Sequence, residues 1–172
     1  MKTVEELTKF AREFLRKEYN EELPFDVTIN GRLKTTLGRY DFYRSMNGKI
    51  VPRAVMLSRQ LIEYGTTATI ESVLKHELIH LAVSRMGLPF NDGDEEFESE
   101  LRKHGAHSTR EIRLGVYISY RCSDCESQCG TFYGSKNMNK YISSCCKAEL
   151  EAYKEIICDG ESMKEYELVG VL

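Results

Sequence analysis

The stretch TIESVLKHELIHLAVSRM, residues 69–86, determines how the rest of the chain is interpreted. Its apolar side chains recur every three or four residues, which predicts one long helix that ends at Gly87. His76 and His80 are four positions apart, so a helix presents both rings on one face, with their Cβ atoms about 5–6 Å apart. Glu77 directly follows the first histidine. The segment therefore places two nitrogen donors and one carboxylate on a single helix.

Two histidines at this spacing, with a glutamate after the first, are typical of a catalytic zinc site. Zinc lowers the pKa of a bound water toward about 7. Glu77 can then take the proton of that water as it attacks a carbonyl carbon. Because catalytic zinc usually has three protein ligands, a third must come from elsewhere. The loop at residues 91–96 offers several carboxylates, and His104 and His107 follow it.

Shorter patterns on both sides of this helix indicate an α+β fold. Residues 3–19 open with a capping-box pattern and carry one apolar face, which predicts a helix. Residues 25–43 and 50–57 have the composition of strands, with a turn at residues 46–48 between them. Residues 95–103 predict a polar helix. Because these elements do not alternate as βαβ units, we expect helices packed on a small, mainly antiparallel sheet.

All six cysteines lie after residue 121, so the chain changes in chemical character there. The first two have the CxxC spacing of a zinc knuckle, and two more follow about a hairpin's length later. The four thiols of the predicted structural zinc site are those of Cys122, Cys125, Cys145 and Cys146. Cys129 is the alternative to Cys145, because Ser143 stands where the first cysteine of a second CxxC pair is expected. Cys158 lies beside two isoleucines and is expected to be a core thiol.

The composition is that of a folded domain rather than of a disordered chain. The 172 residues carry 24 Lys and Arg against 27 Asp and Glu, a net charge of −3, which excludes a polycation that coats nucleic acid. No apolar run approaches the roughly 20 residues that span a bilayer, and the charged N-terminal segment lacks the apolar core of a secretory signal. We therefore expect a cytoplasmic protein without membrane contact.

Three parts are predicted: a body at 1–115, a zinc-binding segment at 116–150 and an acid-rich tail at 151–172.

Residues 32–53 are unusually basic and also rich in aromatic side chains. Their six basic residues are Arg32, Lys34, Arg39, Arg44, Lys49 and Arg53. Basic and aromatic residues together can follow a nucleic-acid strand, through charge on the phosphates and stacking on the bases. The same pattern also fits the solvent face of an antiparallel sheet. The acidic balance of the whole chain predicts that any DNA contact is weak and salt-sensitive.

The sequence around HELIH resembles that of the SprT-like metalloproteases, which include the Spartan-type DNA–protein crosslink proteases. The resemblance covers about residues 3–150 and rests on NGRLKTTLGRY at residues 30–40, VMLS at residues 55–58, HELIH, and the polar helix with Phe97. It implies a zincin-like protease body followed by a short zinc-ribbon β-hairpin. It also implies protein substrates that are held near DNA.

In this family a third histidine lies beyond HELIH, ahead of an aromatic residue. The equivalent place here is Asp92, 12 residues after His80 and five before Phe97. A carboxylate oxygen also ligates zinc, so the resemblance favours His76, His80 and Asp92 as ligands of a catalytic zinc. The alternatives for the third ligand are Asp94, Glu95 and His104.

Two functions follow from these observations. The first is a zinc endopeptidase in which Glu77 serves as general base and then donates its proton to the leaving amine. The second is a non-enzymatic, zinc-stabilised module that binds nucleic acid or another partner. The first predicts two zinc ions per chain, one catalytic and one structural, whereas the second predicts only the structural ion.

Overall fold

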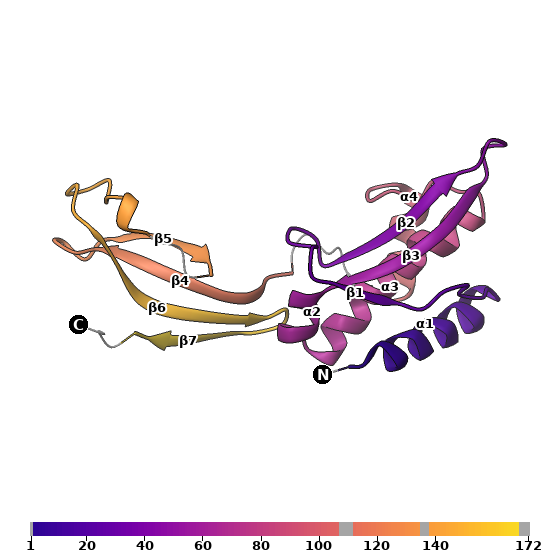
Figure 1. The fold of residues 1–172 in the computed structure, drawn as a ribbon, viewed down its shortest axis with the longest axis horizontal. Coiled ribbons are helices and arrows are strands. Elements are labelled where there is room, and N and C mark those ends of the chain that lie inside the picture. The colour runs from indigo at the N-terminus through magenta and orange to yellow at the C-terminus, as the bar shows by residue number, and fades with distance from the viewer. Residues whose placement is uncertain (1, 107–111, 135–137, 169–172) are drawn as a thin grey trace. The chain divides into compact units, whose positions relative to one another are not determined.

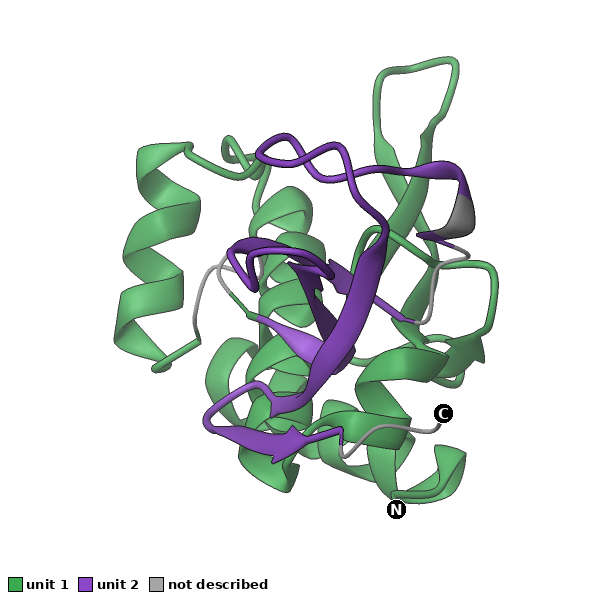
Figure 2. Ribbon diagram, turned by 90° about the vertical axis from the view of Figure 1, so that its left-hand side faces the viewer, with its two compact units in different colours: residues 1–112 green, residues 113–172 purple. Residues whose placement is uncertain are grey.

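In the computed structural model of this chain, residues 2–106, 112–134 and 138–168 are described. The chain divides into two compact units, residues 1–112 and residues 113–172 (Figures 1 and 2). The elements of the first unit are α1 (Val4–Tyr19), β1 (Thr28–Asn30), β2 (Gly38–Arg44), β3 (Ile50–Ser58), α2 (Arg59–Tyr64), α3 (Thr67–Arg85) and α4 (Glu95–Lys103). Those of the second are β4 (Leu114–Cys122), β5 (Gln128–Tyr133), the 3-10 helix η2 (Met138–Lys140), β6 (Leu150–Asp159) and β7 (Met163–Glu167).

The first unit places α3 between a small sheet and two other helices (Figure 1). Its three strands are ordered β1-β3-β2, with β1 parallel and β2 antiparallel to β3. The helix contacts β2 and β3 on one side and α1 and α4 on the others. Leu74, Leu78 and Leu81 of α3 are therefore fully buried. The expected α+β fold is confirmed, and β2 is an edge strand that lies against the HELIH helix.

Local capping explains where the two longest helices begin and end. Thr3 and Glu6 form the predicted capping box at the start of α1, and Asn20 ends this helix in a left-handed conformation with φ 52°. At α3 the hydroxyl of Thr66 accepts the backbone N–H of Thr69. Gly87, with φ 75°, follows the C-terminal turn as expected. The predicted helices at residues 3–19, 69–86 and 95–103 are confirmed to within two residues.

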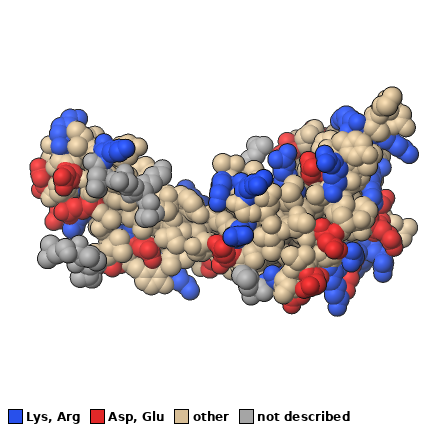
Figure 3. Space-filling view, in the orientation of Figure 1, with Lys and Arg blue, Asp and Glu red and all other residues tan. Residues whose placement is uncertain are grey.

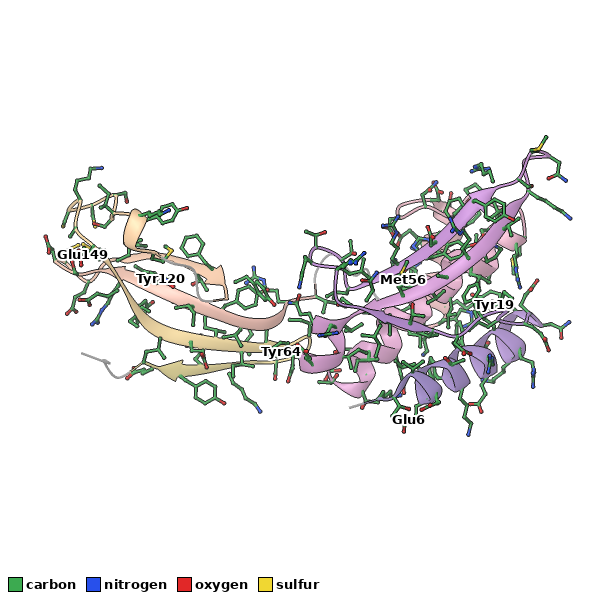
Figure 4. All side chains as sticks on the ribbon, in the orientation of Figure 1. Glu6, Tyr19, Met56, Tyr64, Tyr120 and Glu149 are labelled. Atoms are coloured by element: carbon green, nitrogen blue, oxygen red, sulfur yellow. The ribbon has the colours of Figure 1, made fainter. Side chains whose placement is uncertain are left out.

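The second unit is a four-stranded antiparallel sheet with the order β5-β4-β6-β7. The longest pairing joins β4 to β6, from Leu114 opposite Asp159 to Cys122 opposite Leu150. Its small core consists of Ile118, Tyr120 and Met138, against which Phe132 and Leu150 pack; Tyr120 is labelled in Figure 4.

This sheet corrects the predicted division of the C-terminal part of the chain. We expected a hairpin at 116–150 and a separate acidic tail at 151–172, but β6 and β7 lie within that tail and extend the sheet of β4. The acid-rich segment folds because it also carries apolar residues, and because its charges pair across strands, as in the 2.7 Å contact between Lys154 and Glu165. The boundary between the two units lies between Ile112 and Arg113, not after residue 115.

Candidate metal centre

Three of the predicted ligand side chains meet at one end of the cleft between α3 and β2. The Nε2 atoms of His76 and His80 are 3.2 Å apart. Asp92 Oδ1 lies 3.1 Å from the first of these nitrogens and 3.4 Å from the second. The helix brings the two rings together, and the loop before α4 supplies the carboxylate. Two imidazole nitrogens and one carboxylate oxygen at such short mutual distances form a donor set that suits zinc.

The surroundings of the two histidines also fit metal ligation. His80 Nδ1 donates to the carbonyl oxygen of Phe90 at 2.5 Å, which leaves Nε2 to face the other donors. The ring of Phe97 stacks on that of His80, with centroids 3.9 Å apart, and meets the His76 ring edge-on. Burial, and next the neighbouring His76, lower the pKa of His80, which favours the neutral ring that binds metals.

Glu77 points from α3 toward β2 and is only 5% exposed. The backbone N–H of Tyr40 donates to its carboxylate, and Gly38 leaves space for it, since a Cβ atom there would lie 2.6 Å from Glu77 Oε1. Burial raises the pKa of Glu77 to about 8, opposed by the Tyr40 N–H and assisted by the charge of Asp92. The edge strand thus holds a buried carboxyl group beside the three donors.

A cleft of about 410 Å³ opens onto these side chains. Its other walls come mainly from β2 and the loop before α4, and include Tyr40, Phe42, Phe90 and Asn91. Asp92 stands at the rim, where its side chain is 43% exposed. The cleft is therefore polar at one end, aromatic along its walls and accessible to a molecule from solution.

The other candidates for the third ligand have different surroundings. Asp94 precedes α4 and accepts hydrogen bonds from the backbone and the side chain of Asn91, at 2.7 and 3.0 Å. Glu95 is exposed at the start of α4. His104 lies 3.3 Å from Glu100 in a cluster with Tyr19, which is labelled in Figure 4. His107 lies outside the described residues. Of the described candidates, only Asp92 is grouped with the two HELIH histidines.

The second unit brings together the four predicted thiols, whose sulfur atoms all lie within 4.8 Å of one another. Cys122 comes from the end of β4, and Cys125 Sγ is 3.4 Å from Cys145 Sγ. The alternative, Cys129, lies on β5 and donates instead to the carbonyl oxygen of Ser127. Cys158 is buried on β6, as expected of a core thiol. The four grouped thiols form a second donor set that could hold a metal.

The six basic residues of the segment 32–53 are all exposed. Figure 3 shows Lys and Arg side chains gathered over the loop between β1 and β2, where Arg32 and Lys34 lie. Thr36 of this loop and Gly38, the first residue of β2, line the cleft. A positively charged surface therefore adjoins the candidate metal centre.

None of the helices in the described ranges has the length and apolarity to cross a membrane.

Sequence reasoning missed the contacts that support the centre. Neither the backbone N–H of Tyr40 nor the carbonyl of Phe90 is visible in a residue pattern, because both belong to the main chain. The signals for Gly38 and Phe97 were present only as parts of the family resemblance. Tertiary packing of β2 and α4 against α3 brings these two residues next to the HELIH segment.

Comparison with known proteins identifies the family. The model of the SprT-like family matches residues 4–114. Proteins named "Protein SprT-like" are similar over most of the chain. The one from Lysinibacillus sphaericus is 30% identical over 159 residues, 86% of this chain and 91% of that protein. The one from Streptococcus mutans is 27% identical over 151 residues, which are 84% of this chain and 94% of that protein. The chain therefore belongs to the SprT-like family.

Proposed function

We propose that this chain is a zinc-dependent endopeptidase with a zincin-like first unit. The observation that carries the proposal is the convergence of His76, His80 and Asp92 at an open cleft, with the buried Glu77 beside them. Membership of the SprT-like family supports the same reading. When bound, a zinc ion supplies a Lewis acid that lowers the pKa of a water molecule toward about 7 and favours the ionised form of a neighbouring carboxyl group.

Glu77 is the proton carrier in this proposal. Its carboxylate accepts the proton of the water that attacks the peptide carbonyl, and the same oxygen then returns the proton to the leaving amine. The N–H of Tyr40 orients the carboxylate, while Gly38 allows it to approach the strand. The carbonyl of Phe90 orients the His80 ring. The aromatic side chains of Tyr40, Phe42 and Phe90 line the cleft in which the proposal places the substrate.

A second zinc, held by the four cysteines, has a structural role in the proposal. The second unit has a small core, and a structural zinc contributes about 10–16 kcal/mol in finger peptides. This is comparable with the 5–15 kcal/mol that stabilise a typical domain. A zinc ion held by the four thiols would therefore add to the stability that this small apolar core provides.

The proposed substrates are proteins held near DNA, inside the cytoplasm. The exposed basic residues beside the cleft support this, because phosphate groups bound there would keep a DNA-associated protein close to Glu77. With a net charge of −3 for the whole chain, we expect the DNA contact to be weak and to disappear as salt is raised.

Metal content tests the two sites directly. The wild-type chain should contain two equivalents of zinc, and His76→Ala or Asp92→Ala should contain one. Glu95→Ala is the matched control, since this neighbouring acid lies outside the donor group, and it should keep both. One equivalent in the wild type, unchanged by His76→Ala, would instead favour a non-enzymatic, zinc-stabilised binding module.

Cleavage of an unfolded protein such as casein, with and without single-stranded DNA, tests the chemistry. Glu77→Gln should lose cleavage while it retains two equivalents of zinc, because the amide cannot accept the proton. The control variant Glu96→Gln should cleave as the wild type does, because Glu96 is exposed on α4 and lies outside the donor group. Undiminished cleavage by Glu77→Gln would overturn the role proposed for this residue.

A further inference from the structure

Two turns in the second unit have the same backbone pattern but different cysteine positions. In the first, the N–H of Cys122 donates to the carbonyl of Ser127 at 2.9 Å, and Glu126 between them is left-handed with φ 58°. In the second, the N–H of Ser143 donates to the carbonyl of Ala148 at 2.8 Å, and Lys147 is left-handed with φ 61°. Each bond links residue i to residue i+5, and the left-handed residue is the fifth of the six residues in each turn.

This equivalence assigns a counterpart to every residue of the first turn. Cys125 at the fourth position corresponds to Cys146, since each immediately precedes the left-handed residue. Cys122 at the first position corresponds to Ser143, which is not a cysteine. Cys145 falls at the third position, where the first turn has Asp124. The second turn therefore has its usual fourth-position thiol and an additional thiol one position before it.

Ser143 occupies the turn position that Cys122 has in the first turn, but its side chain forms hydrogen bonds instead of offering a thiol. It is 1% exposed, and its hydroxyl oxygen accepts the N–H of Ala148 at 3.1 Å. The same oxygen lies 3.2 Å from Cys122 Sγ, so the hydroxyl contacts a thiol of the donor group. Cys145 Sγ lies within 4.8 Å of the other three sulfur atoms of that group.

We propose that Cys145 has taken over the metal-ligand role of the first turn position, and that Ser143 now positions Cys122 by hydrogen bonding. This inference rests on the cysteine site of the proposed function and deepens it. The ligand has moved by two residues along the chain while the backbone of the turn has kept its form. The site is thus a four-thiolate site with two adjacent cysteines in one turn, and divalent ions that bind thiolates well, such as Zn²⁺, Cd²⁺ and Co²⁺, suit it.

The proposal predicts that the ligand can be moved back. The experiment uses the full chain with His76→Ala, so that only the cysteine site is counted, and measures Zn²⁺ affinity by competition with a chelator. Cys145→Ser should weaken binding by more than about 100-fold, beyond the 10–100-fold that loss of a supporting contact costs. Adding Ser143→Cys to that variant should restore the affinity to within about tenfold. Adding Ser144→Cys instead, at the exposed second position, should restore nothing.

Two single substitutions separate the remaining assignments. Ser143→Ala should still bind one Zn²⁺, about 10–100-fold more weakly, because it loses a hydrogen bond but no ligand. Cys129→Ser should bind as the parent does, since its sulfur lies outside the donor group. Substituted Co²⁺ provides a second measurement, because its thiolate charge-transfer absorption should match in the parent and the restored double variant.

The opposite results overturn the proposal at different points. If the His76→Ala parent binds no Zn²⁺, the cysteine site itself is wrong. If it binds one ion but Ser143→Cys fails to rescue Cys145→Ser, the transfer of the ligand role is wrong while the site remains. Loss of the ion in Cys129→Ser would assign the fourth ligand to Cys129.

Discussion

Replacing Gly38 with alanine is expected to displace Glu77 and to slow cleavage on the order of 100-fold, without removing the zinc proposed for the first site. A Cβ atom on residue 38 would lie 2.6 Å from Glu77 Oε1 and 2.7 Å from its Cγ. Ordinary contacts begin near 3.4 Å, so the side chain of Glu77 would have to move by about 0.8 Å. It cannot do so freely, because it is buried and is bonded to the N–H of Tyr40.

Two magnitudes follow from this overlap. Forcing one extra methyl group into a packed site costs typically about 1–3 kcal/mol, which urea unfolding measures. Misplacing a reacting group by about 1 Å slows catalysis on the order of 100-fold, which initial rates of casein cleavage measure. Zinc content should stay at the wild-type value, because His76, His80 and Asp92 are not displaced by the methyl group.

Gly31→Ala is the matched control for this substitution. A Cβ atom at residue 31 would be 3.5 Å from Arg59 Nε, an ordinary contact with the end of a flexible side chain. This variant should therefore unfold and cleave as the wild type does. If Gly38→Ala were as stable and as active as Gly31→Ala, the close approach of β2 to Glu77 would have no functional meaning, and the reasoning would be refuted.

Three other perturbations test different parts of the structure. Phe97→Ala should lower the free energy of unfolding by about 3–5 kcal/mol and weaken zinc binding at the first site, because the fully buried ring stacks on His80; unchanged urea unfolding would contradict this. Tyr40→Phe should cost about 1 kcal/mol through loss of the 3.0 Å hydrogen bond to Ser84 but keep cleavage, since the backbone N–H remains. Chelation of zinc should remove amide-exchange protection from the second unit, 113–168, before it unfolds the first; equal protection with and without the chelator would exclude a structural metal there.

The sequence predicted the elements whose signals are local. The HELIH helix was recognised from its apolar period and from Gly87, and α3 spans Thr67–Arg85. The helix predicted at residues 95–103 coincides with α4, Glu95–Lys103, because its charges and its two buried apolar side chains follow helical spacing. In both segments the propensity of the residues and the tertiary packing favour the same conformation, so a single-sequence reading was sufficient.

The surroundings of the candidate site were beyond such a reading. Tyr40 and Glu77 are separated by 37 positions in the sequence, and only the packing of an edge strand against α3 brings the N–H of one to the carboxylate of the other. The choice of Asp92 came from the family resemblance, since neighbouring acids have the same donor chemistry. What distinguishes Asp92 is position: Asp94 is engaged by Asn91, whereas Asp92 reaches both histidines.

The strands β6 and β7 show why an acid-rich segment can be mistaken for a tail. Opposite β4, Ser119 pairs with Lys154 but Tyr120 pairs with Ala152, so Tyr153 is an extra residue at a bulge. A bulge reverses the alternation of faces halfway along a strand, and the period of two that identifies a strand is lost at that point. Without that period, the acidic residues are the clearest feature of residues 151–172, and they favour the prediction of a tail. Acids at the solvent-exposed positions of an antiparallel sheet are nevertheless fully compatible with strand structure. Skipping Tyr153 restores the alternation of Leu150, Glu151 and Ala152, but residues 154–159, KEIICD, still do not alternate, because two polar residues are followed by three apolar ones; this half of β6 is identified as a strand only by its pairing with β4.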